Sequence, residues 1–219
     1  MTDPEKYRAL LDRLGPGVRL VAVSKTKPAA DILQLYQLGQ RDFGENYVQE
    51  LADKQQQLPA DIRWHFLGHL QSNKVKFIAP FIHLIHGVDS LKLLKEIDKQ
   101  ALRYDRTIDC LLQVHIAREE TKFGFDSQDL EKMFHEDIKE WEGWKNIRIR
   151  GLMGMASFTE DTGKIRSEFR GLRSLFVQHF SASAPEGPIL SMGMSGDFTI
   201  AIEEGSNMVR IGSLLFGSR

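Results

Sequence analysis

The chain has 219 residues, and its 42% hydrophobic and 27% charged residues are the proportions of a soluble globular protein. Lys and Arg number 29 and Asp and Glu 30, so the net charge of -1 argues against a nucleic-acid-binding scaffold, which is usually strongly basic. Because no apolar run approaches the roughly 20 residues of a membrane-spanning helix and segment 1–14 lacks the apolar core of a signal peptide, we expect a cytoplasmic protein that binds neither membrane nor nucleic acid.

Short apolar runs, rich in Val, Ile, Leu and Met, predict eight strands. Most of them lack clean alternation of polar and apolar residues, which is typical of strands that are buried on both faces. In chain order the runs are 18–24, 41–44, 62–67, 81–87, 108–116, 147–155, 189–192 and 208–211.

Stretches with helical spacing lie between these runs. In one of them Leu130, Phe134 and Trp141 fall at steps of three or four residues and form an apolar stripe. Ser127 stands where an N-cap belongs, and Gly39 stands where a helix ends. The predicted helices are 3–14, 28–38, 89–102, 126–141, 159–180 and a short one at 198–204.

Strands that alternate with helices predict an α/β fold, a single (β/α)8 barrel of the TIM type. We expect one domain over residues 1–219, with residues 1–17 as an extra helix packed on the barrel. An open, doubly wound sheet is the alternative, but it normally uses five or six strands, so eight strands favour closure. In a barrel the functional residues lie after the C-terminal ends of the strands.

The first strand ends at a lysine that could be a nucleophile. Lys25 is the first charged residue after an apolar run and one serine, so it would be partly desolvated at the barrel mouth. Desolvation lowers the pKa of an amine and makes it able to form a Schiff base. The other interpretation is a lysine that only marks the end of a strand. Asn46, after the second strand, could contact a polar ligand or cap the next helix together with Tyr47.

The ends of the last two strands are typical of an anion site. Segments 191–197 and 209–213 are Gly- and Ser-containing turns that lead into helices, and Arg210 lies between them. Loops after the seventh and eighth strands are the usual phosphate site of a barrel. A lysine, a phosphate site and an arginine together suit a phosphate-bearing aldehyde, of which pyridoxal phosphate is the common one.

Histidine and cysteine indicate no further chemistry. His65 and His69 lie four residues apart but straddle a strand end, so they should point differently, and no acidic ligand lies nearby in sequence. We therefore expect no metal site. Cys110 is the one cysteine, which excludes an internal disulfide and a thiolate zinc site, and we expect it to be a small buried hydrophobe.

At these strand ends the chain resembles the pyridoxal phosphate homeostasis protein family (the YggS/PROSC group). The matching stretches are 21–28 (VAVSKTKP), 43–50 (FGENYVQE), 65–74 (HFLGHLQSNK), 190–195 (LSMGMS) and 208–212 (MVRIG). Their combination and order are specific and span nearly the whole chain. The resemblance implies a fold-type III barrel similar to the N-terminal domain of alanine racemase.

The resemblance also implies the cofactor and its site. Lys25 would hold pyridoxal 5'-phosphate as a Schiff base, an internal aldimine, and Arg210 would face the pyridine nitrogen. Ser195, Gly212 and Ser213 would hold the phosphate, and Asn46 would line the site. Segment 116–125 departs from the pattern, because many relatives carry Ser where Phe123 stands, and this leaves the role of that loop open.

A positive arginine opposite the pyridine nitrogen disfavours its protonation, and an unprotonated ring is a poorer electron sink. Alanine racemase adds a second base from a separate domain, and none of the four tyrosines here lies in an appended domain. We therefore expect a non-catalytic protein of intracellular pyridoxal phosphate homeostasis that buffers or delivers the cofactor, as a monomer. Transient contact with pyridoxal phosphate-dependent apoenzymes stays open. The alternatives are an amino-acid racemase, a Schiff-base lyase, or a class I aldolase that needs no cofactor.

Overall fold

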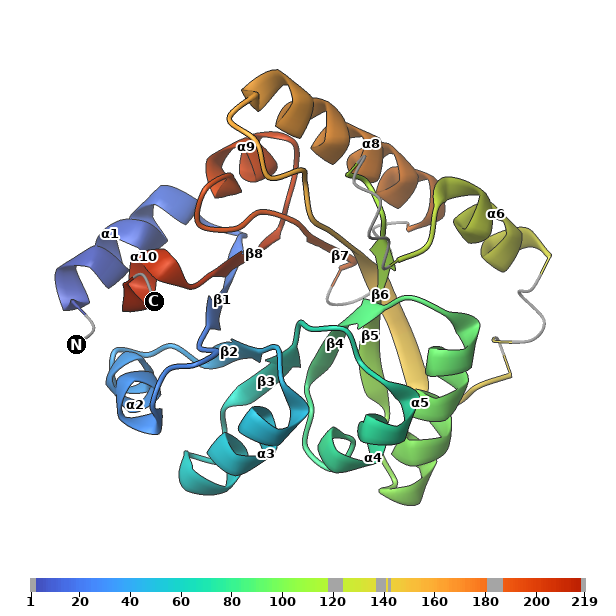
Figure 1. The fold of residues 1–219 in the computed structure, drawn as a ribbon, viewed down its shortest axis with the longest axis horizontal. Helices are drawn as coiled ribbons and strands as arrows, with labels where there is room; N and C mark the ends of the chain where they lie inside the picture. The colour runs from blue at the N-terminus through green and yellow to red at the C-terminus, as the bar shows by residue number, and fades with distance from the viewer. Residues whose placement is uncertain (1–2, 118–123, 137–140, 142, 181–186, 218–219) are drawn as a thin grey trace.

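The computed structural model describes residues 3–117, 124–136, 141, 143–180 and 187–217, and it shows a closed barrel of eight parallel strands surrounded by helices (Figure 1). The strands follow one another around the barrel in chain order. The last strand closes on the first over four residue pairs, from Arg19 with Met208 to Ala22 with Ile211. The predicted (β/α)8 barrel is confirmed, and the open sheet is excluded.

Each of the predicted runs overlaps one strand, and β2 and β4 each extend one residue beyond their run. The strands are β1 (Arg19–Val23), β2 (Asp42–Glu45), β3 (Arg63–Phe66), β4 (Leu84–Val88), β5 (Ile108–Val114), β6 (Ile147–Gly154), β7 (Ile189–Ser191) and β8 (Met208–Ile211). The largest difference in position is at β4, which begins three residues later than predicted. Phe81 and Ile82 lie in the turn before the strand, where their N–H groups donate to the Ile78 carbonyl, and they are apolar because Ile82 is buried and Phe81 packs against the core.

The helices cover the outside of the barrel (Figure 1). They are α1 (Pro4–Leu14), α2 (Ala29–Gln37), α3 (Val48–Gln57), η1 (Ser72–Lys74), α4 (Val75–Ile78), α5 (Leu91–Arg103), α6 (Ser127–His135), α8 (Thr162–His179), α9 (Phe198–Glu203) and α10 (Ser213–Phe216). The sequence pattern did not delimit α3, α4 or α10. Helix α6 ends earlier than predicted, and residues 137–140 lie outside the described part.

Two local predictions about helix ends have different outcomes. The N-cap of α6 is Asp126, whose carboxylate accepts from the Asp129 N–H in a capping box, so Ser127 is the first helical residue and not the cap. Gly39 follows α2 with a φ of 103°, as the predicted helix end requires. Among the described helices none is long and apolar enough to cross a membrane.

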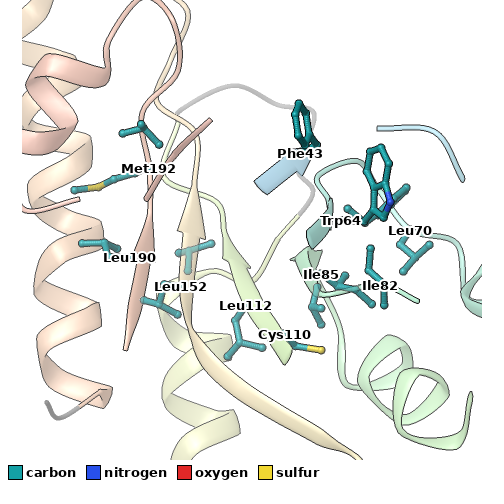
Figure 2. Packing of buried hydrophobic residues seen from close by; sticks show 14 of the residues in the cluster. Phe43, Trp64, Leu70, Ile82, Ile85, Cys110, Leu112, Leu152, Leu190 and Met192 are labelled. Carbon is teal, nitrogen blue, oxygen red and sulfur yellow. The ribbon is translucent and has the colours of Figure 1, made fainter. Parts of the chain in front are cut away.

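Strand residues point alternately toward the helices and into the barrel, and this divides the apolar core into two clusters. The outward side chains, among them Phe43, Trp64, Ile85 and Cys110 (Figure 2), belong to a cluster that also contains the buried faces of the helices. Cys110 is buried as predicted, and burial raises the pKa of its thiol. The inward cluster is small and consists of Val21, Leu84, Leu111, Met153, Ile189 and Met208.

The two ends of the described chain meet on one side of the barrel. Figure 1 shows α1 beside α10, near β1 and β8. Tyr7, Leu10 and Leu14 of α1 are buried, and the Tyr7 hydroxyl donates to Gln40 Oε1 at 3.0 Å. The extent of the domain over residues 1–219 stays a prediction, since residues 1–2 and 218–219 lie outside the described part.

Candidate functional site

A pocket of about 510 Å³ opens at the C-terminal end of the barrel. Its walls come from the residues that follow β1, β2, β3, β6, β7 and β8. The six residues that the sequence predicted for the site all line it: Lys25, Asn46, Ser195, Arg210, Gly212 and Ser213. The fold therefore brings together positions that are up to 188 residues apart in the chain.

Lys25 enters the pocket because it continues the inward alternation of β1. Val21 lies in the barrel interior and Val23 lines the pocket, so Lys25 is the next inward position. Strand β1 ends at Val23, and after Lys25 the chain turns through Thr26, whose φ of 63° is in the left-handed region. The Lys27 N–H donates to the Ser24 carbonyl and closes this turn.

A buried ionic cluster holds the turn in place from behind. Lys54 Nζ of α3 donates to Glu45 Oε1 and to Glu50 Oε1, each at 2.7 Å, and to the Ser24 carbonyl at 2.8 Å. The Ser24 hydroxyl donates to Glu45, and the Thr26 N–H donates to Glu50. Burial raises the pKa of Glu45, and the Lys54 ammonium opposes that shift. The cluster connects both residues that flank Lys25 to β2 and α3.

Sequence reasoning missed this cluster. Its one sequence signal is an acidic residue, Glu45, at the end of a buried strand, followed by Glu50 and Lys54 at helical spacing. That spacing alone is usual on solvated helix faces.

Arg210 is the buried cation of the pocket. Its Nη1 donates to the carbonyl and the hydroxyl of Ser191 at 2.9 and 2.8 Å, and its Nη2 donates to the Gly154 carbonyl at 3.0 Å. Burial lowers its pKa to about 10, while the negative charge of Asp197 acts against this shift. The guanidinium therefore stays charged at neutral pH, and part of it faces the pocket.

The loops after β7 and β8 meet at one wall of the pocket. The Gly212 N–H donates to Ser195 Oγ at 3.3 Å, which joins the two loops. A Cβ at position 212 would lie 3.1 Å from the Val23 carbonyl oxygen, so glycine allows this loop to approach β1 closely. Asp197 also lines this wall, although the sequence did not indicate it. Its Oδ1 accepts from the Met194 N–H at 2.6 Å, and burial raises its pKa.

Asn46 lines the pocket between β2 and α3. The N-cap position of α3 is Tyr47, and its side chain makes no capping hydrogen bond, so the capping interpretation of these two residues is wrong. A Cβ on Gly68 would lie 2.2 Å from the Asn46 carbonyl oxygen. Glycine at position 68 therefore allows the loop after β3 to pack directly on the backbone of Asn46.

The remaining walls include residues that sequence reasoning did not select. The segment after β6 contributes Ser157, whose N–H and hydroxyl each donate to Glu168 of α8 at 2.7 Å. Lys27 lines the pocket as well, and its Nζ donates to the Phe216 carbonyl at 3.1 Å. The ionisable side chains of the described lining are thus Lys25, Lys27 and Arg210 against one acid, Asp197, and this excess of positive charge suits an anionic ligand.

The structure separates the two histidines at the end of the third predicted strand. His65 is buried in the barrel interior, whereas His69 is exposed and pairs with Asp89 at 3.0 Å. Elsewhere in the described residues, Asp42, His65 and His83 place possible ligand atoms within 4.8 Å of one another. Arg63 donates to both carboxylate oxygens of Asp42, so the negative charge of this carboxylate is already paired with a guanidinium. For segment 116–125, residues 118–123 lie outside the described part.

Comparison with known proteins gives consistent matches along the chain. The model of the alanine racemase N-terminal domain family matches residues 5–219. The pyridoxal phosphate homeostasis protein of Aquifex aeolicus is 38% identical, over 98% of this chain and 94% of its own length. The protein of the same name from Synechocystis is also 38% identical, over 100% of both chains.

Solved structures agree with these matches. PipY of Synechococcus elongatus, with PLP bound, has a TM-score of 0.85 and 36% identity, over 98% of this chain and 99% of PipY. The alanine racemase of Bartonella henselae, with covalently bound pyridoxal phosphate, has a TM-score of 0.70 and 18% identity, over 97% of this chain and 59% of the racemase. That second likeness shows the fold alone.

Proposed function

The chain belongs to the pyridoxal phosphate homeostasis protein family, within the wider alanine racemase N-terminal domain family, and from this premise we propose that it binds pyridoxal phosphate at the barrel mouth and serves the homeostasis of that cofactor. The observation that carries the proposal is the convergence of Lys25, Arg210 and the loops after β7 and β8 on one pocket with excess positive charge. PipY, which is 36% identical, was solved with PLP bound.

The residues of the pocket fit a phosphorylated aldehyde. When bound, the cofactor supplies an aldehyde carbon to which an amine can add with loss of water. Lys25 is the amine that we assign to this position, on a turn that the buried Lys54 cluster holds in place. Ser195, Gly212 and Ser213 offer hydroxyl and N–H donors for the phosphate, and Asn46 offers an amide from the segment after β2.

Arg210 has a separate role in this proposal. Facing the pyridine nitrogen, its positive charge would keep a proton off that nitrogen, because two positive charges would otherwise oppose each other. Three of its N–H groups are fixed by Ser191 and Gly154, so the guanidinium cannot turn away from the pocket without breaking buried hydrogen bonds.

We propose further that the protein carries the cofactor without turnover. Racemisation needs a second proton acceptor across the pocket from the lysine. In the described lining the remaining candidates are Asp197 and Lys27, and each already binds a backbone group. Exchange of the α-hydrogen of L-amino acids with solvent deuterium tests this point. We expect no exchange at enzymic rates, and such exchange, if lost in Lys25→Ala, would show an enzyme.

The binding proposal is tested by absorption spectroscopy with pyridoxal phosphate, before and after borohydride, followed by mass mapping of the modified peptide. We expect a yellow band that disappears on treatment with borohydride, because reduction of the imine to an amine leaves the cofactor covalently attached to Lys25. Lys25→Arg keeps the positive charge but should lose the band, whereas Lys99→Arg, on the exposed face of α5, should keep it. Absence of a band, or label spread over surface lysines, would contradict the proposal.

A further inference from the structure

A line of buried polar side chains starts at Arg210 and crosses the barrel interior away from the pocket. Arg210 donates to Ser191 Oγ of β7, which lies 3.1 Å from His86 Nδ1 of β4. His86 Nε2 lies 2.9 Å from His65 Nδ1 of β3, and His65 Nε2 lies 3.0 Å from Asp42 Oδ1 of β2. We call Ser191, His86, His65 and Asp42 the interior chain.

With both imidazoles neutral, the donors and acceptors of the interior chain allow one direction only. The ionised Asp42 can only accept, so His65 Nε2 carries a hydrogen and donates to it. A neutral His65 then has a bare Nδ1, which accepts from the Nε2–H of His86. A neutral His86 in turn has a bare Nδ1, which accepts from the Ser191 hydroxyl, whose oxygen accepts from Arg210. Every hydrogen bond therefore runs from the pocket toward Asp42.

The charges around the chain agree with this direction. Burial lowers the pKa of both imidazoles, and His83 and the positive Arg210 further lower that of His86. Asp42 raises the pKa of His65, while Arg19 and Arg63 lower it. Asp42 itself is held ionised by hydrogen bonds from Arg63 and His65.

The far end of the chain lies at the opposite end of the barrel from the pocket. Asp42 is the first residue of β2, and it accepts from Nε and Nη2 of Arg63, the first residue of β3. The Arg63 side chain is 46% exposed, so this end reaches solvent. A purely apolar filling would suffice for a barrel core, and buried polar groups are costly unless all are paired. A fully paired line from the pocket to solvent is more than filling requires.

We propose that the interior chain is a positioning device that fixes the guanidinium of Arg210 and makes ligand binding in the pocket depend on Asp42 at the other end of the barrel. Asp42, His65, His86 and Ser191 are positioning residues in this role, because they act through Arg210 and do not touch the pocket. The inference rests on the proposed function for its ligand, but the order of protons in the chain does not.

The first experiment measures that order without ligand. Nitrogen-15 NMR of histidine side chains distinguishes the two neutral tautomers from the charged form. We expect both His86 and His65 to be neutral with hydrogen on Nε2 at pH 7. A hydrogen on Nδ1 or a charged ring in either residue would overturn the proposal. So would Zn²⁺ binding that displaces the His65 hydrogen, which would make Asp42, His65 and His83 a metal site.

The second experiment compares two buried carboxylates at the same end of the barrel. Asp109, the second residue of β5, pairs with Arg148 and Arg150 and does not belong to the interior chain. We expect Asp42→Asn to weaken pyridoxal phosphate binding about 2- to 30-fold, the range for mutations along coupled networks, and Asp109→Asn to leave it unchanged. Equal effects of the two substitutions would mean that Asp42 acts through stability alone and would overturn the proposal.

A double-mutant cycle provides the decisive control. Ser191→Ala cuts the chain beside Arg210, so Asp42→Asn should have no further effect on binding in the Ser191→Ala protein. Additive effects would overturn the proposal. If the wild-type protein binds no pyridoxal phosphate, the proposed function fails. The same four proteins are then compared by the ¹⁵N chemical shifts of the Arg210 guanidinium, and additive shift changes would again overturn the proposal.

Discussion

At the residue scale, one feature of the chain directs Lys25 into the pocket and another holds the turn on which it lies. The inward alternation of β1 carries Lys25 to the pocket, and this could be followed in the sequence once a strand was assigned. What fixes its turn is Lys54, a lysine with 8% side-chain exposure bonded to two glutamates and a carbonyl. A buried charge is stable only with such partners, so each member of the cluster depends on the others.

Lys54→Met tests that dependence. The substitution leaves Glu45 fully buried without its cation, and we expect a loss of about 3 kcal/mol in the free energy of unfolding at neutral pH. Without Lys54 the folded-state pKa of Glu45 rises further above its unfolded value. The folded state then holds a proton that the unfolded state releases, so the variant loses stability as pH rises above about 4.5.

Urea unfolding of Lys54→Met at pH 5 and pH 8 measures this effect, with the exposed Lys99→Met as the matched control. Adding Glu45→Gln to Lys54→Met should recover part of the loss at pH 8. A Lys54→Met protein that is as stable as the wild type at pH 8 would mean that the cluster does not hold the turn.

At the element scale, the barrel depends on places where two strands approach too closely for a side chain. The pairing of β5 with β6 shifts register opposite Arg150, which is a bulge, and Gly151 follows with a φ of 152°. A Cβ on Gly151 would lie 1.9 Å from the Ile189 carbonyl oxygen of β7. The bulge thus places β6 against β7. The segment that follows β6 forms one wall of the pocket, so its position depends on this contact.

Two glycine-to-alanine substitutions distinguish the need for close approach of β6 and β7 at Gly151 from the effect of replacing any glycine by alanine. We expect Gly151→Ala to destabilise the protein by about 3 kcal/mol or more, on the order of a strained backbone plus displacement of β7. Gly171 lies in α8, where an added Cβ would meet no heavy atom within 4 Å, so Gly171→Ala should stabilise by about 0.5–1 kcal/mol. Thermal and urea unfolding measure the change in the free energy of unfolding for both variants. Changes of the same sign in the two variants would contradict the packing argument.

At the scale of the whole molecule, the sequence predicted the barrel because its signal is repeated. Eight apolar runs with helical stretches between them define a closed parallel sheet even where single boundaries are wrong, as at β4. The ends of the predicted strands pointed to Lys25, Asn46, Arg210 and the turns 191–197 and 209–213. The choice of Ser195, Gly212 and Ser213 within those turns came from the resemblance to the family, and all six residues line the pocket.

The parts that could not be predicted depend on register around the closed barrel. His86 and Ser191 are 105 residues apart, and only the closed barrel brings them within 3.1 Å. The contact of Ser157 with Glu168 could not be predicted either. Glu168 belongs to the following helix, and neither residue stands in a distinctive motif. Helix α3 was not delimited because one of its buried residues is Lys54, which a hydrophobic pattern counts as polar.

Because residues from both ends of the chain line the pocket, a bound ligand should stabilise the barrel as a whole. Lys25 follows β1 and Ser213 follows β8, so occupancy of the pocket joins the strands where the barrel closes. Pyridoxal phosphate at 100 times its Kd should add about 2.7 kcal/mol, which raises the midpoint of thermal unfolding by about 5–10 °C for a chain of this size.

Differential scanning calorimetry with matched ligands separates the contributions to that shift. Pyridoxal without its phosphate should give a smaller shift, because the loops after β7 and β8 lose their ligand, and Ser213→Ala should reduce the difference between the two compounds. Lys25→Arg should lower the shift from both compounds, since either aldehyde needs the amine. If inorganic phosphate alone raised the midpoint as much as pyridoxal phosphate does, the pocket would be a phosphate site in which Lys25 takes no part.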